Sequence, residues 1–314
     1  MIRALAAASI LALGLGMGGR AEPAIYVASQ EAGALTRLDG PAVVGLRLGS
    51  GPAGLAATAD GTLFLTHPEA GRITVVVPGG GDLRALPFRG QPFGIAASAD
   101  GRRLFVGDWQ AGTVSRIDAR TGSVEAAAPV GREPAGIVLD GEARVFVSER
   151  GGDSVSILDA DTMALRARLP VGRAPFALAL SPDGDRLYVG NVRSNDLTVI
   201  DARGLLVLAT VPSGRSPYGV ATSRDGGLIL VTNQESGSVS VLGHDLVPRA
   251  RIPVGRYPEG VAVAGDRAYV ANWYSNDVSI IDLAGLREIE RRPVPDGPRA
   301  VVAVPLRGRG EADR

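Results

Sequence analysis

The stretch Pro175–Arg215 decides the fold of this chain. It reads PFALALSPDG (175–184), DRLYVGN (185–191), VRSNDLTVID (192–201) and, three residues later, LLVLATVPSGR (205–215). Each apolar run has the length of a strand, is rich in Val, Ile, Leu and Tyr, and ends in turn residues such as Asp-Gly, Ser-Asn-Asp or Gly-Arg. No helical period lies between the runs. The stretch therefore predicts four antiparallel strands joined by tight turns.

The same unit recurs along the chain. Each copy opens with a proline, and successive openings are 40 to 42 residues apart. A fixed period of this length, built from strands alone, is typical of the blades of a β-propeller. The openings are Pro52, Pro92, Pro134, Pro175, Pro217, Pro258 and Pro298. The sequence therefore predicts an all-β, seven-bladed β-propeller of four-stranded antiparallel blades.

The two chain ends are expected to share one blade. Residues 24–50 match the second, third and fourth strands of the unit, whereas the last copy contains only a first strand, over 298–305. With that strand innermost, the N- and C-terminal strands close the ring and leave no open sheet edge for aggregation. We therefore assign residues 22–307 to one propeller domain.

The first 21 residues have the pattern of a secretory signal. Met1–Arg3 is cationic, Ala4–Met17 is apolar but too short to cross a bilayer, and Gly19–Ala21 offers small residues for cleavage. We expect residues 1–21 to be removed and the mature protein to be periplasmic or secreted, with an uncleaved anchor as the alternative. The charged residues 308–314 are expected to form a disordered tail.

Composition excludes several classes of protein. The formal net charge is zero and the pI is near 6.8, which gives no basic field for nucleic acid or an anionic membrane. The chain has no cysteine, so disulfides, thiolate metal sites, covalently attached c-type haem and a cysteine nucleophile are excluded. Beyond the signal no apolar run is long enough to span a membrane.

Three segments carry a resemblance to a known family. Tyr188–Asn191, Leu230–Asn233 and Tyr269–Asn272 are each followed by a Ser-containing turn and another strand. This pattern resembles the YVTN repeat of exported, bacterial seven-bladed propellers. The resemblance implies the same fold and an exported protein, and many members have no known enzymatic activity. Some are associated with pyrroloquinoline quinone (PQQ)-dependent alcohol oxidation, so it also implies a PQQ-like anionic ligand or a periplasmic protein partner.

One face of the predicted ring collects arginines. The loops into the innermost strands and the loops after the second strands share a face, so the arginine of each Gly-Arg-x-Pro loop is expected at the mouth of the central channel. Guanidinium groups there suit a ligand with several carboxylates or phosphates. Alternatively, each arginine pairs with an acidic neighbour or caps a carbonyl of the adjacent blade, and so fastens the blades together. The candidates are Arg132, Arg173, Arg215 and Arg256, with Arg89 and Arg299 displaced by one and three residues.

Large aromatic side chains lie in the same loops. Trp109, Trp273 and Tyr274 could form a platform for a planar anionic ring or a peptide, or could simply cover the tops of their blades. Arg150 and Arg193 are expected further out on this face, as solvated surface charges.

Signals for catalysis are few. At the position of Asn191, Asn233 and Asn272, four blades carry Ser29, His67, Asp108 and Glu149 instead. His67, with Glu69 two residues later, is the candidate for a base or a metal ligand, but a chain with two histidines cannot build a histidine-rich metal cage. Glu31, Asp108, Glu149 and Glu259 are the acidic residues expected near the channel, where the arginines would repel a divalent cation.

Two functions remain open on the sequence. The favoured one is an exported, non-catalytic binding or scaffold propeller whose arginine-lined face binds an anionic small molecule or a partner protein, with no certain cofactor. The alternative is a lactonase-like hydrolase or a lyase that uses His67 and a nearby carboxylate, with or without a metal.

Overall fold

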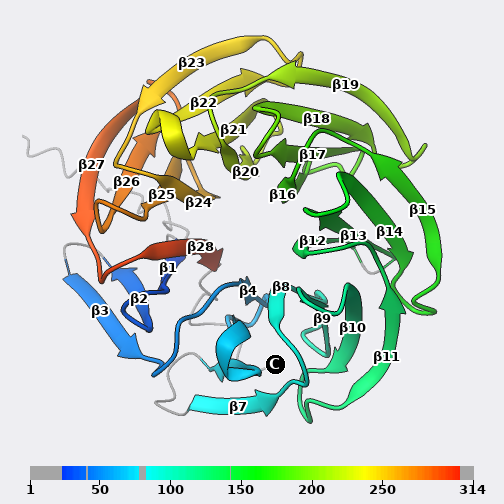
Figure 1. Cartoon of the computed structure of the whole chain (residues 1–314). Coiled ribbons are helices and arrows are strands. Elements are labelled where there is room, and N and C mark those ends of the chain that lie inside the picture. Colours follow the sequence, from blue (N-terminus) through cyan, green and yellow to red (C-terminus); the bar gives the residue numbers. More distant parts are fainter. Residues whose placement is uncertain (1–22, 40–41, 78–82, 142, 305–314) are drawn as a thin grey trace, which may run out of the picture.

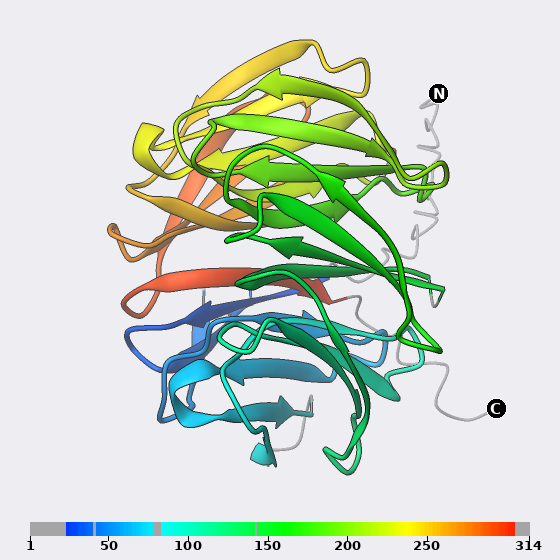
Figure 2. The same cartoon turned by 45° about the vertical axis from the view of Figure 1, so that its right-hand side comes forward.

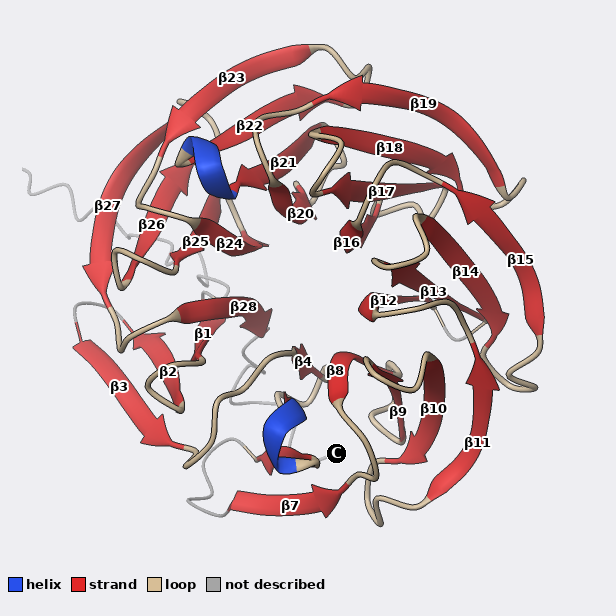
Figure 3. Ribbon diagram, in the orientation of Figure 1, coloured by secondary structure: helices blue, strands red, loops and turns tan. Residues whose placement is uncertain are grey.

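The computed structural model describes residues 23–39, 42–77, 83–141 and 143–304. In this part of the chain, strands form seven four-stranded antiparallel sheets arranged in a ring (Figures 1 and 3). The predicted seven-bladed propeller is therefore confirmed. The predicted signal segment 1–21 and tail 308–314 lie outside the described residues. Within the described ranges, no helix combines the length and apolar character needed to cross a membrane.

In each blade the first strand named below lies nearest the axis of the ring, and the last lies at its outer edge. One blade contains β28 (Pro298–Val304), β1 (Ala24–Ser29), β2 (Ala34–Asp39) and β3 (Ala42–Arg47). The next contains β4 (Leu55–Ala57), β5 (Leu63–His67), β6 (Arg72–Val76) and β7 (Leu83–Pro87). It is followed by β8 (Pro92–Ala97), β9 (Arg103–Asp108), β10 (Thr113–Asp118) and β11 (Val124–Pro129). The fourth contains β12 (Pro134–Asp140), β13 (Arg144–Glu149), β14 (Ser154–Asp159) and β15 (Leu165–Pro170).

The remaining three blades follow the same order. They contain β16 (Pro175–Leu180), β17 (Arg186–Asn191), β18 (Asp196–Asp201) and β19 (Leu206–Pro212); then β20 (Pro217–Thr222), β21 (Leu228–Asn233), β22 (Ser238–Gly243) and β23 (Pro248–Pro253). The last contains β24 (Pro258–Ala264), β25 (Arg267–Asn272), β26 (Asp277–Asp282) and β27 (Arg287–Pro293). Two short 3-10 helices, η1 (Pro68–Ala70) and η2 (Gln234–Ser236), follow second strands and lie on the same face of the ring (Figure 2).

The ring is closed by the two ends of the chain. Strand β28 pairs antiparallel with β1, with Val301 opposite Val27. It also contacts β24 on one side and β4 on the other, so the C-terminal strand completes the innermost circle. The predicted shared blade is confirmed.

The hydrophobic core lies between neighbouring blades. Phe64 and Ile73 of one blade, for example, share a buried cluster with Leu104 and Val106 of the next. The middle strands are buried, whereas outer strands such as β15 alternate between exposed and half-buried residues. Because each blade packs only on its two neighbours, the innermost strands remain available to line the axis.

Candidate functional site

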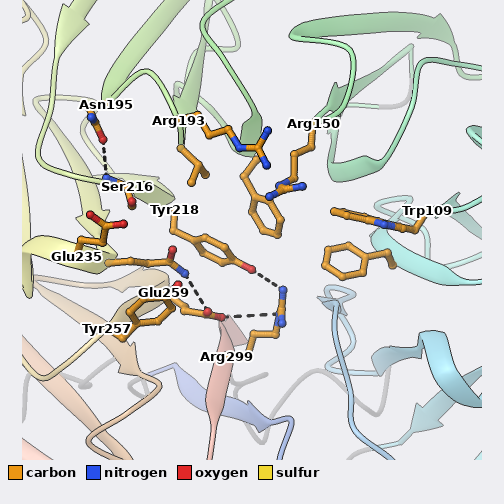
Figure 4. Close-up of a pocket in the computed structure, with 14 residues that line it drawn as sticks. Trp109, Arg150, Arg193, Asn195, Ser216, Tyr218, Glu235, Tyr257, Glu259 and Arg299 are labelled. Atoms are coloured by element: carbon orange, nitrogen blue, oxygen red, sulfur yellow. Dashed lines mark hydrogen bonds and ion pairs between the residues drawn. The ribbon is translucent and has the colours of Figure 1, made fainter.

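A cavity of about 670 Å³ opens on the face that carries the loops into the innermost strands and the loops after the second strands (Figure 4). Its aromatic lining residues are Phe93, Trp109, Phe176, Tyr218 and Tyr257. Its charged lining residues are Arg150, Arg193, Glu235, Glu259 and Arg299. An open cavity that combines flat aromatic surfaces with charged groups suits a small molecule.

An irregularity in the innermost strands builds this cavity. In β20 the pairing with β21 accommodates one extra residue between Pro217 and Val220. The same shift follows the opening proline in β8, β12, β16, β24 and β28. A bulge turns a side chain away from the regular alternation of the strand. The residues directly after the proline that line the cavity are Phe93, Phe176, Tyr218, Glu259 and Arg299.

Four of these side chains form the floor of the cavity: Phe93, Phe176, Tyr218 and Arg299. They line both the cavity and a second space of about 240 Å³ between the innermost strands below. The ring of Phe176 stacks on Tyr218 with 4.0 Å between centroids and meets Phe93 edge-on at 5.9 Å. The Arg299 guanidinium lies 5.2 Å from the centroid of Phe93 and 5.8 Å from that of Tyr218. The floor therefore combines aromatic surface with one positive charge.

Arg299 is held from several sides. Its Nη1 donates to Gln30 Oε1 at 2.6 Å, and its Nη2 donates to the Tyr218 hydroxyl. Its Nε lies 3.8 Å from Glu259 Oε2, and its side chain is only 16% exposed. These contacts join the C-terminal strand to the N-terminal part of the chain and to β20 and β24, so the guanidinium is fixed in place.

Glu259 is the most unusual ionisable group of the cavity. It is 4% exposed. Its Oε1 accepts a hydrogen bond from Gln234 Nε2 at 2.9 Å, whereas its Oε2 has no hydrogen-bond partner among the described residues. Burial raises the pKa of Glu259 from 4.5 to about 7, against the opposing effects of Arg299 and the Gln234 hydrogen bond. Near neutral pH the carboxyl group is therefore present in both protonation states.

Two arginines and a tryptophan form the upper rim. Arg150 Nη1 donates to Glu133 Oε2 at 2.7 Å, and the Arg150 guanidinium lies 5.7 Å from the centroid of Trp109. Arg193 is exposed, and within the described ranges its side chain has no ion pair. The rim therefore presents an uncompensated guanidinium near aromatic surface.

The structure does not gather the six predicted arginines at the channel. Arg299 lines the cavity, whereas the other five are exposed and lie outside its lining. Four of them donate from Nη2 to a carbonyl in the loop after the second strand: Arg132 to Gly151, Arg173 to Arg193, Arg215 to Glu235 and Arg256 to Tyr274. The four arginines therefore cap carbonyls, as in the alternative, but in the blade that each arginine leads into and not in an adjacent blade. Ligand binding by these five stays a prediction.

The local backbone explains where these four arginines lie. The next residue in each loop has a φ of 53° to 59°, so the chain turns sharply before it enters the innermost strand. The arginine precedes that turn and covers the loop of its own blade. The residues with this φ are Glu133, Ala174, Ser216 and Tyr257.

The three predicted aromatic residues do not form one platform. Trp109 lines the cavity and packs on Phe93 with 4.5 Å between centroids. Trp273 lies outside the lining, with its centroid 5.7 Å from the Arg299 guanidinium. Tyr274 is 57% exposed and packs against Tyr257. Arg150 and Arg193, expected further out, instead line the cavity.

His67 and Glu69 lie away from the cavity. His67 is fully buried, with Nδ1 within 3.0 Å of Ser50 Oγ and Nε2 within 2.9 Å of Thr74 Oγ1. Burial, together with the charge of Arg72, lowers the pKa of His67 from 6.5 to about 4, so the ring is neutral. Glu69 is exposed on η1. His67 therefore occupies the position that asparagine has in other blades, where the side chain holds the neighbouring loop by hydrogen bonds.

The other acidic candidates also serve loops or solvent. Asp108 Oδ1 accepts from the backbone N–H groups of Gln110 and Ala111, and Glu149 Oε1 accepts from that of Gly131. Glu31 is exposed. Among the described residues, no group of three or more His, Asp or Glu side chains could hold a metal ion.

The floor residues were missed apart from Arg299, although the sequence contains a signal for them. The prolines mark the start of each blade, and the residues directly after them differ from blade to blade. Those residues are Ala53, Phe93, Ala135, Phe176, Tyr218, Glu259 and Arg299. The residue at this position is small in two blades and large or charged in five. This variation between blades is the sequence signal for the cavity floor.

Solved structures with the same fold come from proteins of different activities. Hydrazine synthase of Kuenenia stuttgartiensis is 22% identical with a TM-score of 0.71, over 80% of this chain and 89% of that chain. A putative 6-phosphogluconolactonase of Bacteroides uniformis is 16% identical with a TM-score of 0.75, over 90% and 99%. A catalytically inactive histidine-to-alanine variant of Staphylococcus aureus virginiamycin B lyase, with quinupristin, is 14% identical with a TM-score of 0.68, over 77% and 84%. At these identities the likeness shows the fold alone.

Sequence comparison identifies the family. A search of curated protein sequences finds no match to this chain. A model of the virginiamycin B lyase family matches residues 43–299, most of the propeller. The YVTN-repeat resemblance is thus not confirmed as the family, although both groups are propellers. With the fold in agreement, the chain belongs to the virginiamycin B lyase family.

Proposed function

We propose that the protein is a small-molecule-binding propeller whose cavity holds a planar ligand with an anionic group. The observation that carries this proposal is Arg193, whose guanidinium lacks an ion pair within the described ranges and lies at the rim of an aromatic cavity. A guanidinium binds a carboxylate or phosphate through paired hydrogen bonds, and aromatic faces stack on a flat ring. A PQQ-like compound or a smaller aromatic carboxylate has both features.

The charges of the cavity set the orientation of such a ligand. Arg150 and Arg193 lie on one side of Tyr218, and Glu235 and Glu259 lie on the other (Figure 4). The anionic group therefore belongs at the arginine side. A ligand with negative charge around its whole edge would meet the carboxylates, so a single anionic end is favoured.

A histidine-dependent reaction is disfavoured. The Staphylococcus aureus lyase is inactive when one histidine is replaced by alanine. The present chain has two histidines, and neither lines the cavity: His67 is buried in the β4–β7 blade, and His244 is exposed on the turn between β22 and β23. We therefore favour binding over a lyase or lactonase reaction through His67.

We also propose that the mature protein acts in the periplasm or outside the cell. The cationic start, short apolar run and small residues of positions 1–21 support export. The YVTN-like segments support a place close to the exported binding propellers, which include PQQ-associated members.

Calorimetric titration tests the binding proposal. The probes are PQQ and quinaldate, a small planar carboxylate, with uncharged quinaldine as the control ligand. We expect quinaldate to bind more tightly than PQQ, whose carboxylates are spread around its ring system. We expect Arg193→Ala to weaken quinaldate binding by about tenfold, because a hydrogen bond to a charged group contributes about 1.5 kcal/mol or more. Arg256→Ala, also exposed on this face but outside the cavity lining, is the matched control. Equal losses in the two variants, or no binding of either anion, would refute the proposal.

A further inference from the structure

We propose that the ligand of the cavity is an aromatic zwitterion, with a carboxylate that binds Arg193 and a protonated amine at its opposite end that binds Glu235. This inference rests on the proposed function, because Arg193 must hold the anionic group. It goes beyond that function by naming the second charged group of the ligand and the residue that recognises it.

Arg193 and Glu235 occupy the same position in neighbouring blades. Each is the second residue after the asparagine that ends the second strand, Asn191 in β17 and Asn233 in β21. The innermost strands of these two blades, β16 and β20, are in contact. Both charged residues are exposed and line the same cavity. The rim therefore carries a positive and a negative group in adjacent blades.

These two charges do not neutralise each other. Within the described ranges no ion pair joins Arg193 to Glu235. Glu235 Oε2 lies 3.8 Å from Nε of Arg215, and the Arg215 and Glu235 side chains are 70% and 56% exposed. An ion pair of this length between exposed groups contributes little. The Glu235 carboxylate is therefore accessible from the cavity and available to a cationic group of the ligand.

The loops that carry the two charges are tied together. Asn195 Oδ1 accepts a hydrogen bond from the Ser216 backbone N–H at 2.8 Å, which joins the loop of Arg193 to the loop that enters the next blade (Figure 4). In that second loop, Nη2 of Arg215 donates to the Glu235 carbonyl oxygen at 3.2 Å. The backbones of both charged residues are therefore held before a ligand arrives, so little entropy is lost in ordering them when it binds.

The acidic side of the cavity suits an amine. Glu259 also lies on this side, but it is buried and lies against Arg299, so Glu235 is the carboxylate that a ligand can reach. Tyr257 lines the same side (Figure 4), and an aromatic face attracts an ammonium group. With the rim arginines opposite, the field across the cavity favours a molecule with one negative and one positive end over a molecule whose far end is neutral.

Calorimetric titration with two matched carboxylates tests this inference. The ligand para-aminomethylbenzoate carries an ammonium group where para-ethylbenzoate carries a methyl group, and the two molecules otherwise have the same shape. We expect the wild type to bind para-aminomethylbenzoate about tenfold more tightly, because its ammonium group donates a hydrogen bond to a carboxylate. We expect Glu235→Gln to abolish this preference and to leave the affinity for para-ethylbenzoate unchanged. Arg193→Ala should weaken the binding of both ligands.

Glu69→Gln is the matched control, because Glu69 has the same loop position in the β4–β7 blade and is exposed, but lies outside the cavity lining. This variant should keep the wild-type preference. Suppose that para-ethylbenzoate binds and that Arg193→Ala weakens its binding. Equal affinities of the wild type for the two ligands, or a preference that survives in Glu235→Gln, would then overturn this inference alone. Failure of para-ethylbenzoate to bind, or binding that Arg193→Ala leaves unchanged, would refute the proposed function and this inference with it.

Discussion

Replacing Glu259 by Gln should change how the stability of the protein depends on pH. The pKa of Glu259 is about 7 in the folded protein and 4.5 in an unstructured chain. Between these values the folded state holds a proton that the unfolded state has released, so the free energy of unfolding falls as pH rises. The gap between the two pKa values corresponds to about 3 kcal/mol. Because Glu259 is only 4% exposed, solvent screening reduces this amount little.

Urea denaturation, followed by tryptophan fluorescence, measures this effect. Unfolding free energies of the wild type and of Glu259→Gln are compared from about pH 4 to about pH 8. We expect the wild type to lose about 3 kcal/mol relative to the variant across this range, since Gln cannot ionise and all other groups cancel in the difference. A difference that stays constant with pH would show that Glu259 ionises as it does in water, and would refute the reasoning.

Two further substitutions test the structural reading of the repeat. His67→Asn should make the free energy of unfolding less dependent on acid pH. The pKa of His67 is about 4 in the folded protein, below the ordinary 6.5, so the wild type should lose up to about 3 kcal/mol of stability as pH falls through this range, and the variant should not. If the unfolding free energies of wild type and variant fall equally as the pH is lowered, this expectation is wrong. Gly136→Ala should destabilise by about 1–3 kcal/mol, because its Cβ would lie 2.4 Å from the Phe176 carbonyl oxygen of the next blade. Thermal unfolding measures the loss, Ala177→Gly at the equivalent position of that blade is the comparison, and an unchanged Tm for Gly136→Ala would refute the close approach.

The site shows where sequence reasoning stops. The arginines of the Gly-Arg-x-Pro loops repeat with the blade, and in the structure four of them cap carbonyls of the blade. Arg193 belongs to no such series, yet it lines the cavity. A residue that recurs from blade to blade tends to serve the blade. The residues after the opening prolines instead vary from Ala53 to Arg299, and they face the axis.

The sequence by itself determined the number of blades, the strands of each blade and the closure of the ring. These depend on short-range properties, namely strand-length apolar runs, turn residues and a period of 40 to 42 residues, which the chain carries locally. Only the tertiary structure decided which side chains meet at the axis. Tyr218, Glu259 and Arg299 come from three different blades, and the raised pKa of Glu259 exists because the surrounding blades exclude water from it. Because desolvation of a side chain depends on the assembled ring, no local sequence pattern could predict the raised pKa of Glu259.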